Sequence, residues 1–347
     1  MTDVSPAQPL LRVSGLQTRY GEHVYPVRGV SFDLHRGESL GIVGESGSGK
    51  SVLLRSIIGV HPRTSTPTVT GSVRFEDEDL LTASPARRQE LLGRRIGVIH
   101  QDPLTSLNPL KRTRDQVLES PRYHGQKASK ADWQTRAHDV LKSVGFPQPQ
   151  DVLHKYPHEM SGGQRQRIGI AAAVVENPTL LFADEPTTAL DVTVQAQVLD
   201  LLERLRAEQG SALVLVTHDL AIVARRCDRI AVMYGGRIVE IAPADQLTTE
   251  PLHPYTSGLL QARPALRGPK AQRLVAIPGT AVPPSRPLSE GCSFASRCPL
   301  ADDRCRTQLP ELTTPSPGSD CQVACWKPGE QPKFSATPSQ ARGDDND

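Results

Sequence analysis

The chain has 347 residues, of which 37% are hydrophobic, enough to bury the core of one large domain with an appended module. Its 40 lysines and arginines nearly balance 38 aspartates and glutamates, which leaves a formal net charge of +2. This balance argues against a protein that coats nucleic acid, because such proteins carry a basic excess.

No segment of the sequence approaches the roughly 20 apolar residues of a membrane-spanning helix, and residues 1–9 are too polar for a signal peptide. We therefore expect a cytoplasmic protein, and if it serves transport, other subunits must supply the pore. Disulfides are disfavoured in the cytoplasm, so the six cysteines need another explanation.

The first part of the chain predicts a phosphate-binding unit. Two β-like runs, residues 10–20 and 27–34, precede a short apolar run at 40–43, and an apolar helical stretch covers 52–60. Between the last two lies a segment that fits G-x-x-x-x-G-K-S/T, formed by Gly44, Glu45, Ser46, Gly47, Ser48, Gly49, Lys50 and Ser51. Glycines let backbone N–H groups face phosphate oxygens, while the lysine and the last serine supply a cation and a Mg²⁺ ligand. The alternative is a flexible glycine-serine turn, which the flanking strand and helix disfavour.

The middle of the chain predicts a helical insertion followed by more α/β structure. Apolar residues recur at helical spacing from Trp133 to Val144, and Gly145 follows as a C-cap. Strands are then expected at 180–183 and 212–216, with a hairpin over 230–241.

Polar residues at the ends of these elements are candidates for chemistry. Asp184 and Glu185 end a strand, where one carboxylate can order Mg²⁺ and the other polarise a water; the alternative is a solvated loop. Ser161 and Gln164 form a capping-box pattern, so a well-capped helix is the structural interpretation. His218 follows another strand, and a lone histidine there is more often a structural hydrogen-bonding group than a catalyst.

The composition changes near residue 250, since half of the 30 prolines and five of the six cysteines lie beyond it. We predict an α/β domain over residues 9–250 and a separate, loop-rich module over 251–334. The polar ends, residues 1–8 and 335–347, are predicted to be disordered.

Six motifs in order closely resemble those of the ABC ATPase family. They are GESGSGKS (44–51), HQDP (100–103), MSGGQ (160–164), LLFADEP (180–186), TALD (188–191) and VTHD (216–219). The resemblance covers about residues 9–245. It implies an α/β fold with a RecA-like P-loop core, an antiparallel β subdomain and a helical subdomain at about 103–175.

The resemblance also implies ATP and Mg²⁺ as cofactors and assigns roles to matching residues. Lys50, Ser51, Val52 and the preceding loop hold the phosphates and Mg²⁺, with Asp184 supporting the metal. Glu185 is the general base, His218 contacts the γ-phosphate, and Gln101 senses Mg²⁺ and the water on a loop that faces the membrane subunit. Ser161, Gly162, Gly163 and Gln164 act on ATP held by the opposite subunit. Tyr20 best fits the aromatic that stacks on adenine, with Tyr25 as the alternative.

A narrower resemblance points to the D-type ATPase of dipeptide and oligopeptide importers. It rests on QDPLTSLNP (101–109), ADEPTTALDVTVQAQ (183–197), HPYTSGLL (253–260) and GCSFASRCP (291–299), and on Val52, where the companion F-type subunit tends to have threonine. It implies a peripheral motor on the cytoplasmic face of the membrane. The implied partners are a second ATPase subunit of the F-type, with a homodimer as the alternative, two permeases and a substrate-binding protein.

Other functions stay open within and outside this branch. Nickel, oligosaccharide or antimicrobial-peptide transport use the same kind of motor. A soluble ABC ATPase acting on DNA or ribosomes is a second class, although such proteins usually have a coiled-coil insertion, paired cassettes or basic arms. A nucleotide-binding protein that does not hydrolyse ATP is a third, against which intact Glu185 and His218 argue.

Four cysteines, Cys292, Cys298, Cys305 and Cys325, match cysteine positions of D-type subunits, and the resemblance implies a 4Fe–4S cluster. Four thiolates in a module too small for a large core are consistent with a metal site that stabilises the module. Their spacing lacks the Cys-x-x-Cys knuckle of structural zinc, so zinc is the alternative. Cys321 competes with Cys325 as fourth ligand, and isolated Cys227 is interpreted as a free cysteine.

Overall fold

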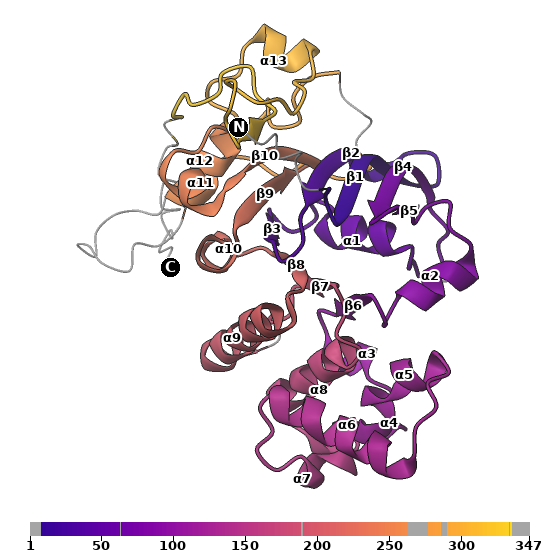
Figure 1. Cartoon of the computed structure of the whole chain (residues 1–347). Coiled ribbons are helices and arrows are strands. Elements are labelled where there is room, and N and C mark those ends of the chain that lie inside the picture. The colour runs from indigo at the N-terminus through magenta and orange to yellow at the C-terminus, as the bar shows by residue number, and fades with distance from the viewer. Residues whose placement is uncertain are drawn as a thin grey trace, which may run out of the picture.

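The computed structural model describes residues 8–62, 64–188, 190–262, 277–285, 290–332 and 334. Within them the strands form two sheets, and a body of helices lies below the larger sheet in Figure 1. The predicted disordered tails lie outside the described residues except for Gln8. No helix in the described ranges combines the length and the apolar content needed to cross a membrane.

The smaller sheet is antiparallel, with strand order β2-β1-β4-β5. Its strands are β1 (Leu11–Tyr20), β2 (Val24–Leu34), β4 (Thr68–Phe75) and β5 (Glu78–Asp79). Leu11 of β1 pairs with Leu34 on one side and Phe75 on the other, so one face is apolar and covers α1 (Lys50–Ile58). The antiparallel β part of the predicted fold is confirmed.

The larger sheet carries the site and has the order β11-β10-β9-β3-β8-β7-β6. Its strands are β3 (Ser39–Val43), β6 (Ile96–Ile99), β7 (Leu180–Asp184), β8 (Ala212–Thr217), β9 (Arg229–Tyr234), β10 (Arg237–Pro243) and β11 (Gln322–Val323). The five strands from β9 to β6 are mutually parallel, and their continuous apolar runs suit a sheet buried on both faces. Parallel pairing brings the carboxyl ends of β3, β7 and β8 to one edge, where the polar motifs follow.

The predicted hairpin is confirmed, because β9 and β10 pair antiparallel around Gly235 and Gly236. Both glycines have positive φ, 54° and 83°. The tight turn therefore uses a backbone region that glycine occupies without strain.

The helical insertion consists of α3 (Pro103–Ser106), α4 (Thr113–Val117), α5 (Glu119–Tyr123), α6 (Lys130–Ser143), α7 (Gln150–Leu153) and α8 (Gly162–Val174). Val117, Ala137 and Ile168 are fully buried where α4, α6 and α8 meet. As predicted, α6 ends before Gly145, which has φ 89°. The capping box between Ser161 and Gln164 at the start of α8 is also confirmed.

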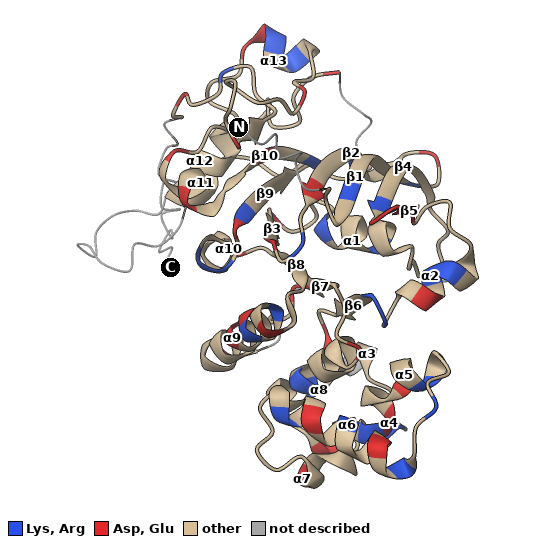
Figure 2. Cartoon of the chain, viewed as in Figure 1, with Lys and Arg blue, Asp and Glu red and all other residues tan. Residues whose placement is uncertain are grey.

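The remaining helices are α2 (Pro85–Leu91), α9 (Val192–Gln209), α10 (Leu220–Arg226), α11 (Ala244–Thr249), α12 (Pro254–Gln261) and α13 (Asp303–Thr307). Of these, α10 and α11 pack against the large sheet. Figure 2 shows both signs of charge on α9 and across α4 to α6, as the balanced composition predicts.

The residues after 250 are loop-rich but do not stand apart from the sheet. β11 pairs with β10 through Glu240 and Val323, and Tyr255 and Phe294 pack on Tyr234 with ring centroids 4.6 and 5.2 Å away. Because these residues share the core of the sheet, the structure does not support a separately folded cysteine module. The predicted domain boundaries stay predictions.

Candidate functional site

The loop from Gly44 to Gly49 leaves β3 and leads directly into α1. A Cβ atom added at Gly44 would lie 2.1 Å from Met233 O, and one at Gly49 would lie 2.0 Å from Pro26 O. Gly49 also has φ 101° and caps α1 without a side-chain hydrogen bond. The N–H groups of the first turn of α1 are thus left for an anion.

A second feature of this loop also indicates a ligand. Ser48 is 4% exposed, and its hydroxyl has no hydrogen-bond partner among the described residues. Buried polar groups are nearly always paired. A phosphate oxygen in the loop would give this hydroxyl an acceptor.

Lys50 is buried at the centre of the site. Its Nζ donates to Gly44 O at 2.8 Å and to Glu45 O at 3.1 Å, and it lies 4.0 Å from Glu185 Oε1. Burial lowers the pKa of Lys50, and the carboxylates of Glu185, Asp184 and Glu45 oppose that shift. The ammonium group is therefore stabilised by anions before any phosphate arrives.

Ser51, in α1 after β3, meets Asp184 at the end of β7, although β8 lies between β3 and β7 in the sheet. Ser51 Oγ donates to Asp184 Oδ1 at 2.8 Å. Burial raises the pKa of Asp184, while the Ser51 hydrogen bond and the Arg55 charge lower it. A hydroxyl and one carboxylate are the protein donors with which Mg²⁺ is held beside phosphates and water, so these residues fit that ion.

Glu185 is held in a strained backbone conformation, φ 43°. Its N–H donates to Val216 O of β8 at 2.9 Å. Its Oε2 accepts from Thr188 Oγ1 at 2.8 Å and lies 3.3 Å from His218 Nδ1. Left-handed backbone at a residue other than glycine costs about 1–3 kcal/mol and clusters at functional sites.

The segment from Ser161 to Gln164 belongs to the helical body, where α8 is drawn well below α1 in Figure 1. A Cβ at Gly163 would lie 2.7 Å from Val194 Cγ1, so glycine allows α8 to start close against α9. Among the described residues no hydrogen bond or ion pair joins this segment to the phosphate loop. The structure therefore does not bring these sequence-predicted residues together with Lys50.

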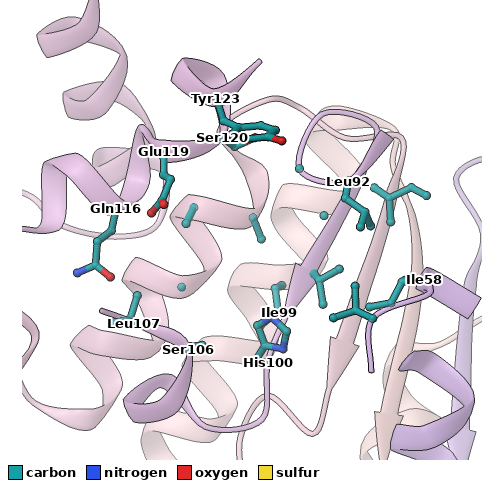
Figure 3. A pocket seen from close by; sticks show the side chains of 18 of the residues that line it. Ile58, Leu92, Ile99, His100, Ser106, Leu107, Gln116, Glu119, Ser120 and Tyr123 are labelled. Atoms are coloured by element: carbon teal, nitrogen blue, oxygen red, sulfur yellow. The ribbon is translucent and has the colours of Figure 1, made fainter. Parts of the chain in front are cut away.

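Gln101 is exposed on the loop between β6 and α3, next to a groove of about 460 Å³ between the sheet edge and the helical body. Figure 3 shows Ile58, Leu92 and Ile99 on one side of it and Leu107, Gln116 and Tyr123 on the other. Tyr123 is 61% exposed. Sequence reasoning missed this groove, because its residues come from seven separate helices and strands, and only a few of them, such as His100 and Pro103, belong to a motif.

The two candidate aromatics lie near the start of the fold. Tyr20 Oη lies 3.2 Å from His61 Nδ1, with the two rings edge to face, and burial raises the pKa of Tyr20. Tyr25 donates its backbone N–H to Pro284 O at 2.8 Å. The assignment of either ring to adenine stays a prediction.

The four cysteines singled out by the sequence line one small cavity of about 20 Å³, together with Phe294 and Trp326. Cys292 donates its N–H to Cys305 O at 2.8 Å. Burial, with a smaller contribution from the other three thiols, raises the pKa of Cys325 to about 12, while the hydrogen bond from the Lys327 N–H lowers it. In the part of the chain that the structure describes, no group of three or more His, Cys, Asp or Glu residues is arranged to hold a metal ion.

The other two cysteines lie elsewhere. Cys321 is buried beside β10, outside the residues that line the cavity, and its N–H donates to Ser319 Oγ at 3.1 Å. Cys227 packs against β3, where its Sγ lies 3.2 Å from the position of a Cβ at Gly41. Burial raises its pKa to about 12, as befits an unreactive core thiol.

Two residues that sequence reasoning missed contact the phosphate loop. Tyr255 and Arg297 both bond to Glu45. Tyr255 lies in the HPYTSGLL segment and Arg297 between Cys292 and Cys298. Those motifs marked the segments, but nothing in them indicated a contact with residue 45.

Comparison with known proteins agrees with this geometry. The family model described as ABC transporter matches residues 27–188, and the model described as oligopeptide/dipeptide transporter, C-terminal region, matches residues 239–305. The chain is 46% identical to the probable peptide ABC transporter ATP-binding protein y4tR of Sinorhizobium fredii, covering 93% of this chain and 96% of that protein.

Two further relatives and two solved structures are similar. Oligopeptide transport ATP-binding protein AppD of Bacillus subtilis is 44% identical over 89% of this chain and 94% of its own. Dipeptide transport ATP-binding protein DppD of Escherichia coli is 43% identical, with coverage of 92% and 97%. A dimeric ATP-binding cassette in a post-hydrolysis state with ADP and Pi has a TM-score of 0.60 and 26% identity, covering 67% of this chain and 98% of its own. The cbiO1 structure from Clostridium perfringens, part of an ABC transporter complex, has a TM-score of 0.60 and 27% identity, covering 70% and 91%.

Proposed function

The chain belongs to the ABC transporter family of ATP-hydrolysing subunits, and from that premise we propose that it powers an importer of dipeptides or oligopeptides. The observation that carries the proposal is the meeting of Lys50, Ser51, Asp184 and Glu185 at one edge of the parallel sheet. The peptide assignment draws on the relatives named for peptide transport and on the matching C-terminal region.

The residues at this edge divide the work of hydrolysis. Lys50 presents a buried cation to the β- and γ-phosphates, while Ser51 and Asp184 offer oxygen ligands to Mg²⁺. When bound, Mg²⁺ supplies positive charge against the phosphate oxygens. The N–H groups of the loop and of the first turn of α1 hold the phosphate oxygens in place.

Glu185 is assigned to the attacking water. A carboxylate at this position orients the water and can accept its proton. Thr188 and His218 restrict where that carboxylate points, because both contact Oε2. Gln101, on the exposed loop after β6, is assigned to sensing the metal and the water.

The working unit is proposed to contain two ATPase subunits. The segment from Ser161 to Gln164 has no bonded contact with the phosphate loop of its own chain within the described residues, and one similar structure is a dimeric cassette. Each site then combines Lys50 of one subunit with Ser161 of the other. Val52 favours an F-type ATPase as the second subunit, so a heterodimer is proposed.

Membrane subunits are proposed to dock in the groove beside Gln101. The groove presents apolar side chains and the exposed ring of Tyr123, and it joins the loop after β6 to the helical body. A short helix from a permease in this groove would contact both. The proposed location is the cytoplasmic face of the membrane, and the proposed partners are two permeases and a substrate-binding protein.

The four cysteines around one cavity are proposed to hold a 4Fe–4S cluster. Support comes from the donor set, four thiols from three separate segments, and from the Lys327 N–H that donates to Cys325 Sγ at 3.3 Å. Because no group of three or more His, Cys, Asp or Glu residues in the described ranges is arranged to hold a metal ion, the proposal rests on this donor set, and zinc stays the alternative. Cys325 is preferred over Cys321 because only Cys325 lines the cavity.

An uptake experiment with the purified transporter tests the proposed function. The chain is co-purified with its membrane subunits, and ATP hydrolysis is measured in proteoliposomes with the binding protein and dipeptides, oligopeptides, nickel ions or oligosaccharides. Stimulation and uptake by peptides alone support the proposal. Stimulation by nickel or oligosaccharide instead would reassign the substrate, and ATPase activity without any associated permease would favour a soluble ABC ATPase.

A further inference from the structure

Glu45, the second residue of the phosphate loop, is held by two side chains from the C-terminal part of the chain. Its backbone N–H donates to Tyr255 Oη at 3.0 Å. Its carboxylate accepts two hydrogen bonds from Arg297, at 2.8 Å from Nη1 to Oε2 and 3.1 Å from Nη2 to Oε1. The phosphate loop is therefore bonded to residues more than 200 positions away.

Arg297 is itself fixed in place by its other contacts. Its Nε donates to Pro278 O at 2.7 Å, and Nη2 donates to Ile277 O at 3.3 Å. Its guanidinium carbon lies 5.7 Å from the centre of the Tyr234 ring, and its side chain is 6% exposed. Such a two-pronged, largely buried pair differs from the exposed ion pairs that contribute little, because removing one partner leaves a buried charge uncompensated.

Glu45 also contacts Lys50, the lysine of the phosphate loop. Its backbone carbonyl, with that of Gly44, accepts from Lys50 Nζ. Glu45 is thus bonded both to Tyr255 and Arg297 of the C-terminal region and to Lys50 of its own loop. A displacement of Glu45 would move the carbonyl that orients the lysine and the turn that presents N–H groups to phosphate.

We propose that Arg297 and Tyr255 are positioning residues for ATP binding, which hold Glu45 so that the phosphate loop and Lys50 are preorganised for the phosphates. The proposal rests on the proposed ATPase function. It makes the C-terminal region a determinant of ATP affinity. At saturating ATP the phosphates themselves hold the loop, so the chemical step does not depend on these contacts.

Steady-state kinetics of the assembled transporter distinguish a role of Arg297 in positioning the loop for ATP from a purely structural role. Arg297→Ala is expected to raise KM for ATP about tenfold, equivalent to about 1.4 kcal/mol, with kcat at saturating ATP unchanged. Arg297→Lys keeps the charge but loses the two-pronged hydrogen bonding, so its KM for ATP is expected to lie between those of the wild type and Arg297→Ala. Arg306→Ala is the matched control, because Arg306 belongs to the same region but pairs with exposed Asp303, and its KM is expected to equal that of the wild type.

Tyr255→Phe provides a second test that keeps the packing of a fully buried ring. It removes only the hydroxyl that accepts from Glu45 and is expected to raise KM by a smaller factor, again without a change in kcat. It decides the question if Arg297→Ala fails to fold. An unchanged KM in the folded variants, or a loss confined to kcat, overturns the positioning role.

The outcome is separable from failure of the proposed function. A wild-type assembly that does not hydrolyse ATP at all refutes the ATPase assignment. In that case, equilibrium binding of ATP to the full-length chain still tests the positioning role. An equal dissociation constant for wild type and Arg297→Ala overturns it, and a tenfold weaker one for the variant supports it.

Discussion

His218 Nδ1 lies 3.3 Å from Glu185 Oε2, which joins the carboxyl ends of β7 and β8 at the centre of the site. The same carboxylate accepts from Thr188, and its other oxygen is 4.0 Å from Lys50 Nζ. Glu185 is therefore the residue on which the groups from three parts of the sequence converge. Its replacement is the most direct test of the mechanism.

Glu185→Gln is expected to retain ATP binding and to lose about 100-fold or more of the turnover, because an amide cannot accept the proton of the attacking water. ATP should then trap a closed pair of subunits, visible by size-exclusion chromatography. Glu208→Gln, on the exposed face of α9, is the matched control and should hydrolyse ATP normally. Near-normal ATPase activity of the Glu185→Gln transporter would remove Glu185 from its assigned role.

Lys50→Ala is expected to weaken both binding and hydrolysis, because the cation that faces the phosphates is lost. We expect ATP affinity to fall by roughly tenfold or more, about 1.4 kcal/mol or more. Lys142→Ala, an exposed lysine on α6, is the control and should bind ATP like the wild type. Binding is measured by calorimetry with Mg·ATP, and equal affinities for the two variants would contradict the assignment.

ATP hydrolysis is expected to need two ATPase subunits, because we propose that the segment from Ser161 to Gln164 completes the site of the opposite subunit. ATPase activity should increase from the chain alone to the chain with an F-type partner, and again when the permeases are added to the pair. Ser161→Arg in one subunit should impair the site that contains Lys50 of the other. Full activity from a species that light scattering shows to be monomeric would refute this arrangement.

Tyr123→Asp is expected to prevent assembly with the permeases, because it replaces an exposed aromatic ring of the groove in Figure 3 with a charge beside Glu119. ATP binding by the isolated chain should be unchanged, since Tyr123 is remote in sequence and structure from the phosphate loop. Co-purification with the membrane subunits is the measurement. Normal yields of the complete transporter would show that the permeases dock elsewhere.

Anaerobically purified protein is expected to be brown and to contain iron and sulfide. Cys298→Ser should abolish the colour, whereas Cys227→Ser should keep it, because Cys227 packs against β3 and not on the cavity. Cys321→Ser should also keep it. Stoichiometric zinc without iron, or no metal after anaerobic preparation, would reject the cluster.

Features that depend only on residues adjacent in the sequence could be predicted from it. The glycines of the phosphate loop, the capping box of Ser161 and Gln164 and the C-cap at Gly145 depend on local backbone geometry. The alternation of apolar runs with these signals was enough to predict the α/β fold. The roles of Lys50, Glu185 and His218 came from the resemblance to the ABC ATPase family and stay predictions.

Only the tertiary structure decided which distant residues touch. The sequence favoured Cys325 as the fourth ligand with Cys321 as a competitor, and the packing of the chain placed Cys325, but not Cys321, on the cavity. No motif linked Arg297 to Glu45, which are 252 residues apart. Such contacts form because the C-terminal region packs against the β9–β10 side of the sheet. That packing depends on many residues together, so no short segment of the sequence predicts it.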